Sequence, residues 1–221
     1  MIRRSPAFVM LVVVSTQAVA QEEGGRPGPR KLLPRDEEIA LARSAAPASI
    51  SAKARVHVLT DTGYVVADSG SGSSGVACLV NRSWPESLEP ECFDAEAAVT
   101  IMPMTVKRTE LFQRSKSKAE VDREIADGVM KGRFRFPTRL AVVYMMSAGQ
   151  KLISDEGRPV GRWRPHLMIH YPFLTNQAVG HEGAPGLDAG LVVNSGLPNA
   201  NLMVVVPNFV TPGGQAPEPR P

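Results

Sequence analysis

Cysteine and histidine are scarce in this chain, with two cysteines and four histidines among 221 residues. Neither Cys78 nor Cys92 has a second cysteine or a histidine at the spacing of a zinc site. His166 and His170 stand four residues apart, but the prolines on either side of this segment favour an extended backbone. On a strand the two imidazoles would be about 13 Å apart, too far to share one ion. We therefore predict no metal site.

Sequence motifs of known chemistry are also lacking. There is no G-x-S-x-G nucleophile elbow, and the glycine- and serine-rich segment 69–75 lacks the terminal Gly-Lys-Ser/Thr of a phosphate-binding loop. Segment 115–118 matches S-x-x-K, but it lies in a charged stretch before a helix start and is interpreted as a solvated linker. No cofactor is predicted.

The charge balance gives little support for nucleic-acid binding. The formal net charge is +3, and Arg3 and Arg4 account for two of these charges, which leaves the rest of the chain near +1 (3 − 2). Segment 106–139 contains ten Lys/Arg against five acidic residues. We interpret it as the solvated face of a helix, and the alternative is a surface that docks on an anionic envelope polymer or membrane.

The first twenty residues have the pattern of a secretory signal peptide. A positive start is followed by an apolar run at 7–14 and a small-x-small cleavage site at 18–20. The run spans 8 residues, whereas a membrane-spanning helix needs about 20, so no integral membrane segment is expected in the mature chain. The sequence thus predicts an exported protein, periplasmic or extracellular, in which Cys78 and Cys92 form a disulfide.

The remainder divides into a linker, one domain and a tail. Segment 21–35 is rich in Gly, Pro and charge and is predicted to be a flexible linker, and 211–221 a disordered tail. Within 36–210 the first helix is expected to begin with Asp36 as its cap and to end before Pro47. Further helices are expected from Asp94, with an interruption at Pro103, and after the capping box at 117–120.

Short β-branched runs between turn residues predict the strands. They are 54–60, 64–67, 76–82, 140–146, 151–154, 159–163, 166–171, 190–194 and 201–206. The order helix, strands, helix, strands predicts an α+β domain: a single mostly antiparallel sheet with helices packed on one side and one disulfide.

Ser147 is the candidate nucleophile, because it directly follows a predicted strand, where a sharp turn exposes a hydroxyl. A serine hydrolase would need a base, which His166, His170 or His57 could supply. Asp155 or Asp188 would orient that base.

The strand 166–171 gives a second candidate site. Alternation places His166, Met168 and His170 on one face, and Tyr144 and Trp163 are expected nearby. We predict that these five residues contribute to a ligand pocket.

Segments 144–150 (YMMSAGQ), 161–175 (GRWRPHLMIHYPFLT) and 201–206 (NLMVVV) resemble a group of exported bacterial proteins to which no activity is assigned. The resemblance implies one coherent domain over 36–210 and gives no catalytic residue or ligand. The leading hypothesis is an exported, soluble, non-catalytic protein that binds a small molecule or a component of the cell envelope. The alternative is a small serine hydrolase using Ser147 with a histidine base such as His166.

Overall fold

The computed structural model describes residues 27–153, 158–181 and 189–213, and the predicted signal peptide lies outside these ranges. Eight strands form one sheet in the order β2-β1-β3-β4-β5-β6-β8-β7. Only β1 and β3 pair in parallel, so the sheet is mixed and mostly antiparallel, as the α+β prediction requires. The strands are β1 (Arg55–Thr60), β2 (Gly63–Asp68), β3 (Ala77–Asn81), β4 (Glu89–Phe93), β5 (Ala141–Met145), β6 (His166–His170), β7 (Leu191–Val193) and β8 (Asn201–Val205).

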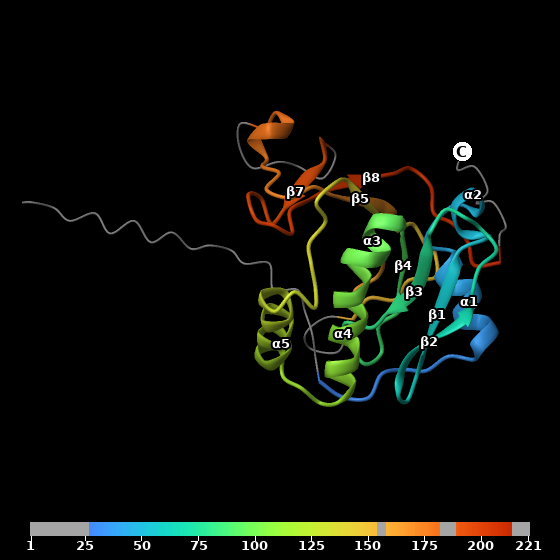
Figure 1. Ribbon diagram of the computed structural model, residues 1–221. Coiled ribbons are helices and arrows are strands. Elements are labelled where there is room, and N and C mark those ends of the chain that lie inside the picture. Colours follow the sequence, from blue (N-terminus) through green and yellow to red (C-terminus); the bar gives the residue numbers. More distant parts are fainter. Residues whose placement is uncertain (1–26, 154–157, 182–188, 214–221) are drawn as a thin grey trace, which may run out of the picture.

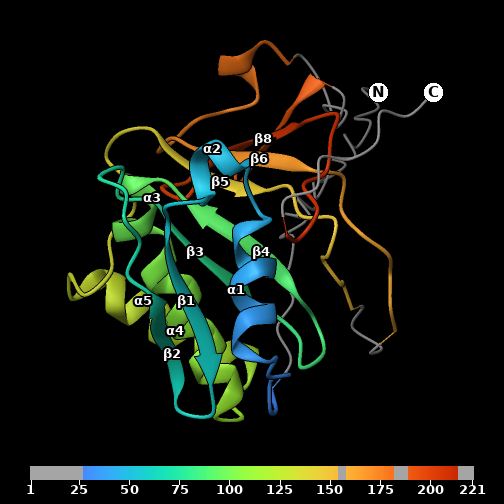
Figure 2. The same ribbon diagram turned by 90° about the vertical axis from the view of Figure 1, so that its right-hand side faces the viewer.

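Helices cover both faces of the sheet rather than one (Figure 1). Helix α1 (Arg35–Arg43) packs on β1, β3 and β4, whereas α3 (Ala95–Thr100) and α4 (Met102–Gln113) pack on the opposite face. Figure 2 views the molecule from the α1 side. Helices cover both faces because both faces of β3 are apolar. Cys78 and Val80 face α1, and Leu79 faces the other helix layer.

The remaining helices are α2 (Ala48–Ser51), α5 (Lys118–Met130) and the short 3-10 helix η1 (Gln177–Val179). Both side-chain contacts of the predicted capping box are present at the start of α5, between Ser117 and Glu120. Val121 and Ile125 then pack, buried, against Met104 and Phe112 of α4. Among the described residues, no helix has the length and apolar character needed to cross a bilayer.

Four elements were not predicted: the short helices α2 and η1, and the longer α4 and β4, and proline explains the latter two. Helix α4 forms because Pro103 occupies its first turn, where the missing N–H has no intrahelical partner. Strand β4 contains Pro90, but β4 pairs with β5 only at Cys92 and Phe93, so the N–H that Pro90 lacks is not required on that side.

Four predicted segments differ from the structure. Helix α1 begins at Arg35 and ends at Arg43, so Asp36 lies in its first turn rather than at its cap. In the described parts of the segments predicted as strands at 151–154 and 159–163, residues 151–153 and 159–163 form only isolated bridges, Leu88 with Lys151 and Ile153 with Pro159. Within the predicted linker, Arg30 is buried and donates from Nε to the carbonyl of Arg82 at 2.9 Å, so this part packs on the domain.

Cys78 and Cys92 form the predicted disulfide, across the β3–β4 pair. A buried ion pair lies near it, between Glu38 of α1 and Arg82 after β3, at 2.9 Å and with both side chains fully buried. The second carboxylate oxygen of Glu38 accepts from the backbone N–H of Leu59 in β1 at 3.0 Å. Arg82 also donates to the carbonyl of Lys31 at 3.0 Å.

We expect Glu38→Leu to lower the free energy of unfolding by about 3–5 kcal/mol, because it leaves the Arg82 guanidinium buried without its counter-ion. The double variant Glu38→Leu/Arg82→Met removes both charges and should recover most of this loss. Urea unfolding of the three proteins measures the effect. A double variant no more stable than Glu38→Leu would contradict this account.

Candidate functional site

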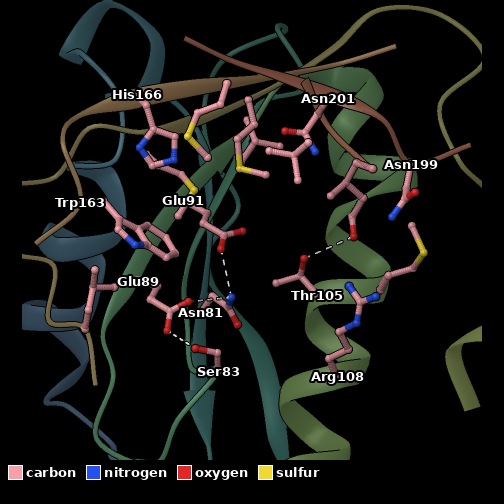
Figure 3. A pocket seen from close by; sticks show the side chains of 18 of the residues that line it. Asn81, Ser83, Glu89, Glu91, Thr105, Arg108, Trp163, His166, Asn199 and Asn201 are labelled. Carbon is pink, nitrogen blue, oxygen red and sulfur yellow. Dashed lines mark hydrogen bonds between the residues drawn. The ribbon is translucent and has the colours of Figure 1, made fainter. Parts of the chain in front are cut away.

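A cavity of about 690 Å³ lies between α4 and the sheet face formed by β4, β5, β6 and β8 (Figure 3). Helix α4 packs on β2 and β3, at one end of the sheet, and the cavity occupies the space between this helix and the strands further along. Leu152, Ile153, Val160, Trp163 and Arg164 line it as well. In Figure 3 Trp163 and His166 lie on one side of the cavity, and Thr105 and Arg108 of α4 on the other.

Strand register brings the predicted β6 residues onto one cavity wall. His166, Met168 and His170 all line the cavity, as do their partners on β8: Val205, Met203 and Asn201. On the other side of β6, Met145 pairs with His166 and Val143 with Met168. The face predicted from alternation in β6 therefore faces the cavity.

The middle of the wall is apolar and adaptable. It carries four methionines, Met104, Met145, Met168 and Met203, together with Val143. Methionine is unbranched and polarizable, so such a wall adjusts to apolar groups of different shape.

Two carboxylates lie at one end of the cavity, from Glu89 and Glu91 on the same face of β4. Asn81 connects them: its Nδ2 donates to Glu89 Oε2 at 3.3 Å and to Glu91 Oε1 at 3.0 Å. The amide is oriented for this, because Asn81 Oδ1 accepts from the Thr109 hydroxyl at 3.1 Å and from the backbone N–H of Arg82 at 2.8 Å.

Glu89 is 5% exposed, and this burial raises the pKa of its carboxyl. The Ser83 hydroxyl donates to Glu89 Oε1 and opposes the rise. Glu89 is thus a buried acid whose hydrogen-bond donors, Asn81 and Ser83, are uncharged.

His170 and Asn201 lie side by side at the other end, as a directly paired couple across β6 and β8. Both are buried, with 5% and 3% of their surface exposed. Within the described part of the chain, three of their polar atoms have no hydrogen-bond partner: both imidazole nitrogens of His170 and the Oδ1 of Asn201. Burial lowers the pKa of His170 to about 4, so its imidazole is neutral at neutral pH.

Trp163 and His166 form another part of the wall, where Trp163 is 43% exposed. Their rings meet edge to face, with centroids 5.7 Å apart. His166 Nδ1 lies 2.8 Å from the carbonyl of Arg164, and burial lowers the pKa of this histidine. Gln150 fixes the backbone of Trp163, because its amide donates to the Trp163 carbonyl at 3.1 Å and accepts from the Trp163 N–H at 3.0 Å.

Tyr144 lies on the opposite face of the sheet from the cavity. It pairs with Cys92 in β4 and Leu167 in β6, and its side chain packs on the core cluster that contains Leu41 and Ala42 of α1. Tyr144 therefore does not join the other four predicted pocket residues. Alternation explains this, since Val143 and Met145 on either side of it line the cavity.

Ser147 lies outside the cavity wall and is 1% exposed. Its hydroxyl is 2.6 Å from that of Ser44 at the end of α1 and accepts from the Gly149 N–H at 3.0 Å. The Nδ1 of His166, the proposed base, is hydrogen-bonded to the backbone carbonyl of Arg164. This geometry gives the serine-hydrolase hypothesis no support, and the candidate orienting residues Asp155 and Asp188 lie outside the described residues.

The other candidate features also have structural explanations. His57 is half-buried in β1 and is not among the residues lining the cavity. Within the described ranges, no three His, Cys, Asp or Glu residues gather in a way that could hold a metal ion. In the basic segment 106–139, many cations pair with acids at the surface. These pairs are Lys107–Glu124, Lys116–Glu120, Lys118–Asp122, Lys131–Asp127, Arg133–Asp127 and Arg139–Glu96.

The acidic end and Asn201 were missed at the level of sequence. A signal was present in the segment 88–93 (LEPECF), in which Leu88, Pro90 and Cys92 alternate with Glu89, Glu91 and Phe93. This is the period of a strand, with two carboxylates on one face. The proline within the segment argued against a strand and hid the pattern.

Acid should destabilise the fold partly through His170. Its folded pKa is lowered from 6.5 to about 4, so the stability associated with its neutral form is present above pH 6.5 and is lost as the pH falls toward 4. The loss should reach about 3 kcal/mol. His170→Phe should reduce the slope of the unfolding free energy against pH in this range. A smaller slope should remain, because the pKa values of His57 and His166 are also lowered. An unchanged profile in the variant would contradict the assignment.

The cavity is the feature from which function can be argued, since it combines an adaptable apolar wall with buried polar groups at two ends. Comparison of the chain with known proteins found no matching family model, no matching curated protein and no matching solved structure. The chemistry of the cavity itself therefore has to identify the kind of ligand.

Proposed function

We propose that this protein is an exported binding protein that holds a small, mainly apolar organic molecule in the cavity between α4 and the sheet. The observation that carries the proposal is the cavity of about 690 Å³, which lies within the range of about 300–1,000 Å³ typical of small-molecule sites. Protein interiors are normally close-packed, so side chains would be expected to fill such a space. A bound molecule explains why the cavity is kept open.

The composition of the wall supports an apolar occupant. Val143 and Met168 lie in the middle of the wall, and Phe112, Phe136 and Leu152 extend the apolar lining. Trp163 adds an aromatic ring that is partly open to solvent, so an incoming molecule can contact it before it is fully enclosed. Polar and apolar side chains both line the cavity, and its buried polar groups, among them Glu89, His170 and Asn201, can orient a ligand whose affinity comes from apolar contact.

Binding can be tested with N-phenyl-1-naphthylamine, a neutral apolar dye whose fluorescence rises in an apolar environment. The purified protein should bind the dye, and Met168→Trp should weaken binding by about tenfold or more, because the larger ring occupies the middle of the cavity. Dye titration measures both.

The matched control is Ile169→Trp, the next residue of β6, which faces away from the cavity. It should bind the dye as the unchanged protein does, with thermal unfolding used to verify that both variants fold. Absence of dye binding by the unchanged protein, or equal loss in both variants, would refute the proposed function.

Export is the second part of the proposal, and the pattern of residues 1–20 together with the Cys78–Cys92 disulfide supports it. Expression of the full chain in a bacterial host should yield an exported protein that begins at Gln21, as judged by intact mass. Ala20→Phe should block this cleavage, because the site requires a small residue, whereas Gln17→Ala should not. A product that retains Met1 in the cytoplasm would rule out export.

A further inference from the structure

We propose that His170 and Asn201 form a subsite for an uncharged hydroxyl group, so that the ligand is an amphipathic alcohol with an apolar body. This inference rests on the proposed function, because it names the head group of the molecule that the cavity holds. It begins with the three polar atoms at this end that have no partner within the described residues, namely both nitrogens of His170 and the Oδ1 of Asn201.

Buried polar atoms without partners are rare in folded proteins, because leaving such a group unsatisfied costs about 1–3 kcal/mol. Here they occur together, since His170 and Asn201 are cross-strand partners on the cavity face. Both side chains are more than nine-tenths buried, so bulk water does not replace the missing bonds. A ligand group with one donor and one acceptor at this position would satisfy two of these three atoms, the imidazole N–H and one acceptor.

The donor and acceptor pattern identifies a hydroxyl. A neutral imidazole has one N–H donor and one nitrogen acceptor, and the Asn201 oxygen accepts only. The ligand group must therefore donate at least one hydrogen bond, and it can accept one from the imidazole. A hydroxyl does both with a single atom, whereas a carboxylate offers no hydrogen to Asn201.

The two residues of this subsite themselves favour an uncharged group, because neither carries a charge at neutral pH. Burial is the cause that lowers the pKa of His170, which indicates a neutral imidazole in a medium of low polarity. The two carboxylates lie elsewhere, on β4, and the pairing order places β5 and β6 between β4 and Asn201 of β8. A charged head group would lose its hydration here without gaining a counter-charge from His170 or Asn201.

The apolar wall indicates that the part of the ligand beyond the hydroxyl is apolar. Going along β6 from His170, the next residue on this face is Met168, flanked by Val143 and Met203. An alkyl or ring body attached to the hydroxyl would lie along these side chains. The hydroxyl at one end and the apolar body in the middle define the class.

The test measures displacement of bound N-phenyl-1-naphthylamine by four eight-carbon probes: octanol, octyl methyl ether, octanoate and octylammonium, at neutral pH. Octanol should displace the dye at about tenfold lower concentration than the other three. The ether is the matched probe, because it keeps the oxygen but lacks the hydrogen that Asn201 requires.

The variants Asn201→Leu and His170→Phe should each abolish the preference for octanol over its methyl ether. Neither should lower the midpoint of thermal unfolding, because each removes at least one buried polar atom that has no partner within the described residues. The matched control is His57→Phe, which removes an imidazole with an unpartnered nitrogen elsewhere in the sheet and should leave the preference intact.

Each alternative result has a distinct meaning. Stronger displacement by octanoate or octylammonium, or an octanol preference that survives in both variants, overturns the subsite while dye binding keeps the proposed function in place. Failure of the unchanged protein to bind the dye removes the proposed function, and the subsite with it.

Discussion

The buried ion pair between Glu38 and Arg82 is the constraint on which the arrangement of both sheet faces depends. Two charges removed from water require each other, so α1 is held on the face where Arg82 points. The Leu59 N–H adds β1 to the same contact. Because side chains alternate along an extended chain, Asn81 and Ser83 on either side of Arg82 point to the other face. There both side chains donate hydrogen bonds to Glu89. The chain segment that places Arg82 in the ion pair on one face therefore also positions the acidic end of the cavity on the other face.

The cavity conflicts with what stability alone would select. Glu89 is a buried carboxylate with a raised pKa, and His170 and Asn201 are buried with polar atoms that lack partners in the described structure. Such groups cost free energy relative to apolar side chains of similar size. Their concentration around one space, while the other face of the sheet buries the apolar cluster around Leu41 and Val56, is the pattern expected where a protein retains a site for something other than its own core.

The residues after β5 hold one wall of the cavity in place. Ser147 links the end of α1 to the loop through Ser44, and its carbonyl accepts from the Gln150 amide at 3.0 Å. Gln150 in turn holds both backbone groups of Trp163. A serine at the end of a strand suggested a nucleophile, but here its hydroxyl fixes the backbone that positions the aromatic wall of the cavity.

The sequence by itself determined the α+β class, the capping box at Ser117, the Cys78–Cys92 pair and the shared face of His166, Met168 and His170, because periodicity, local hydrogen bonds and a short loop act over few residues. It did not determine β4 and α4, where the effect of a proline depends on whether its missing N–H has a partner. Only the tertiary structure decided which elements enclose the cavity. Strand pairing places Tyr144 opposite Leu167, away from it, and brings Asn201 beside His170. These contacts join residues far apart in the chain, and no local pattern specifies a register between distant strands.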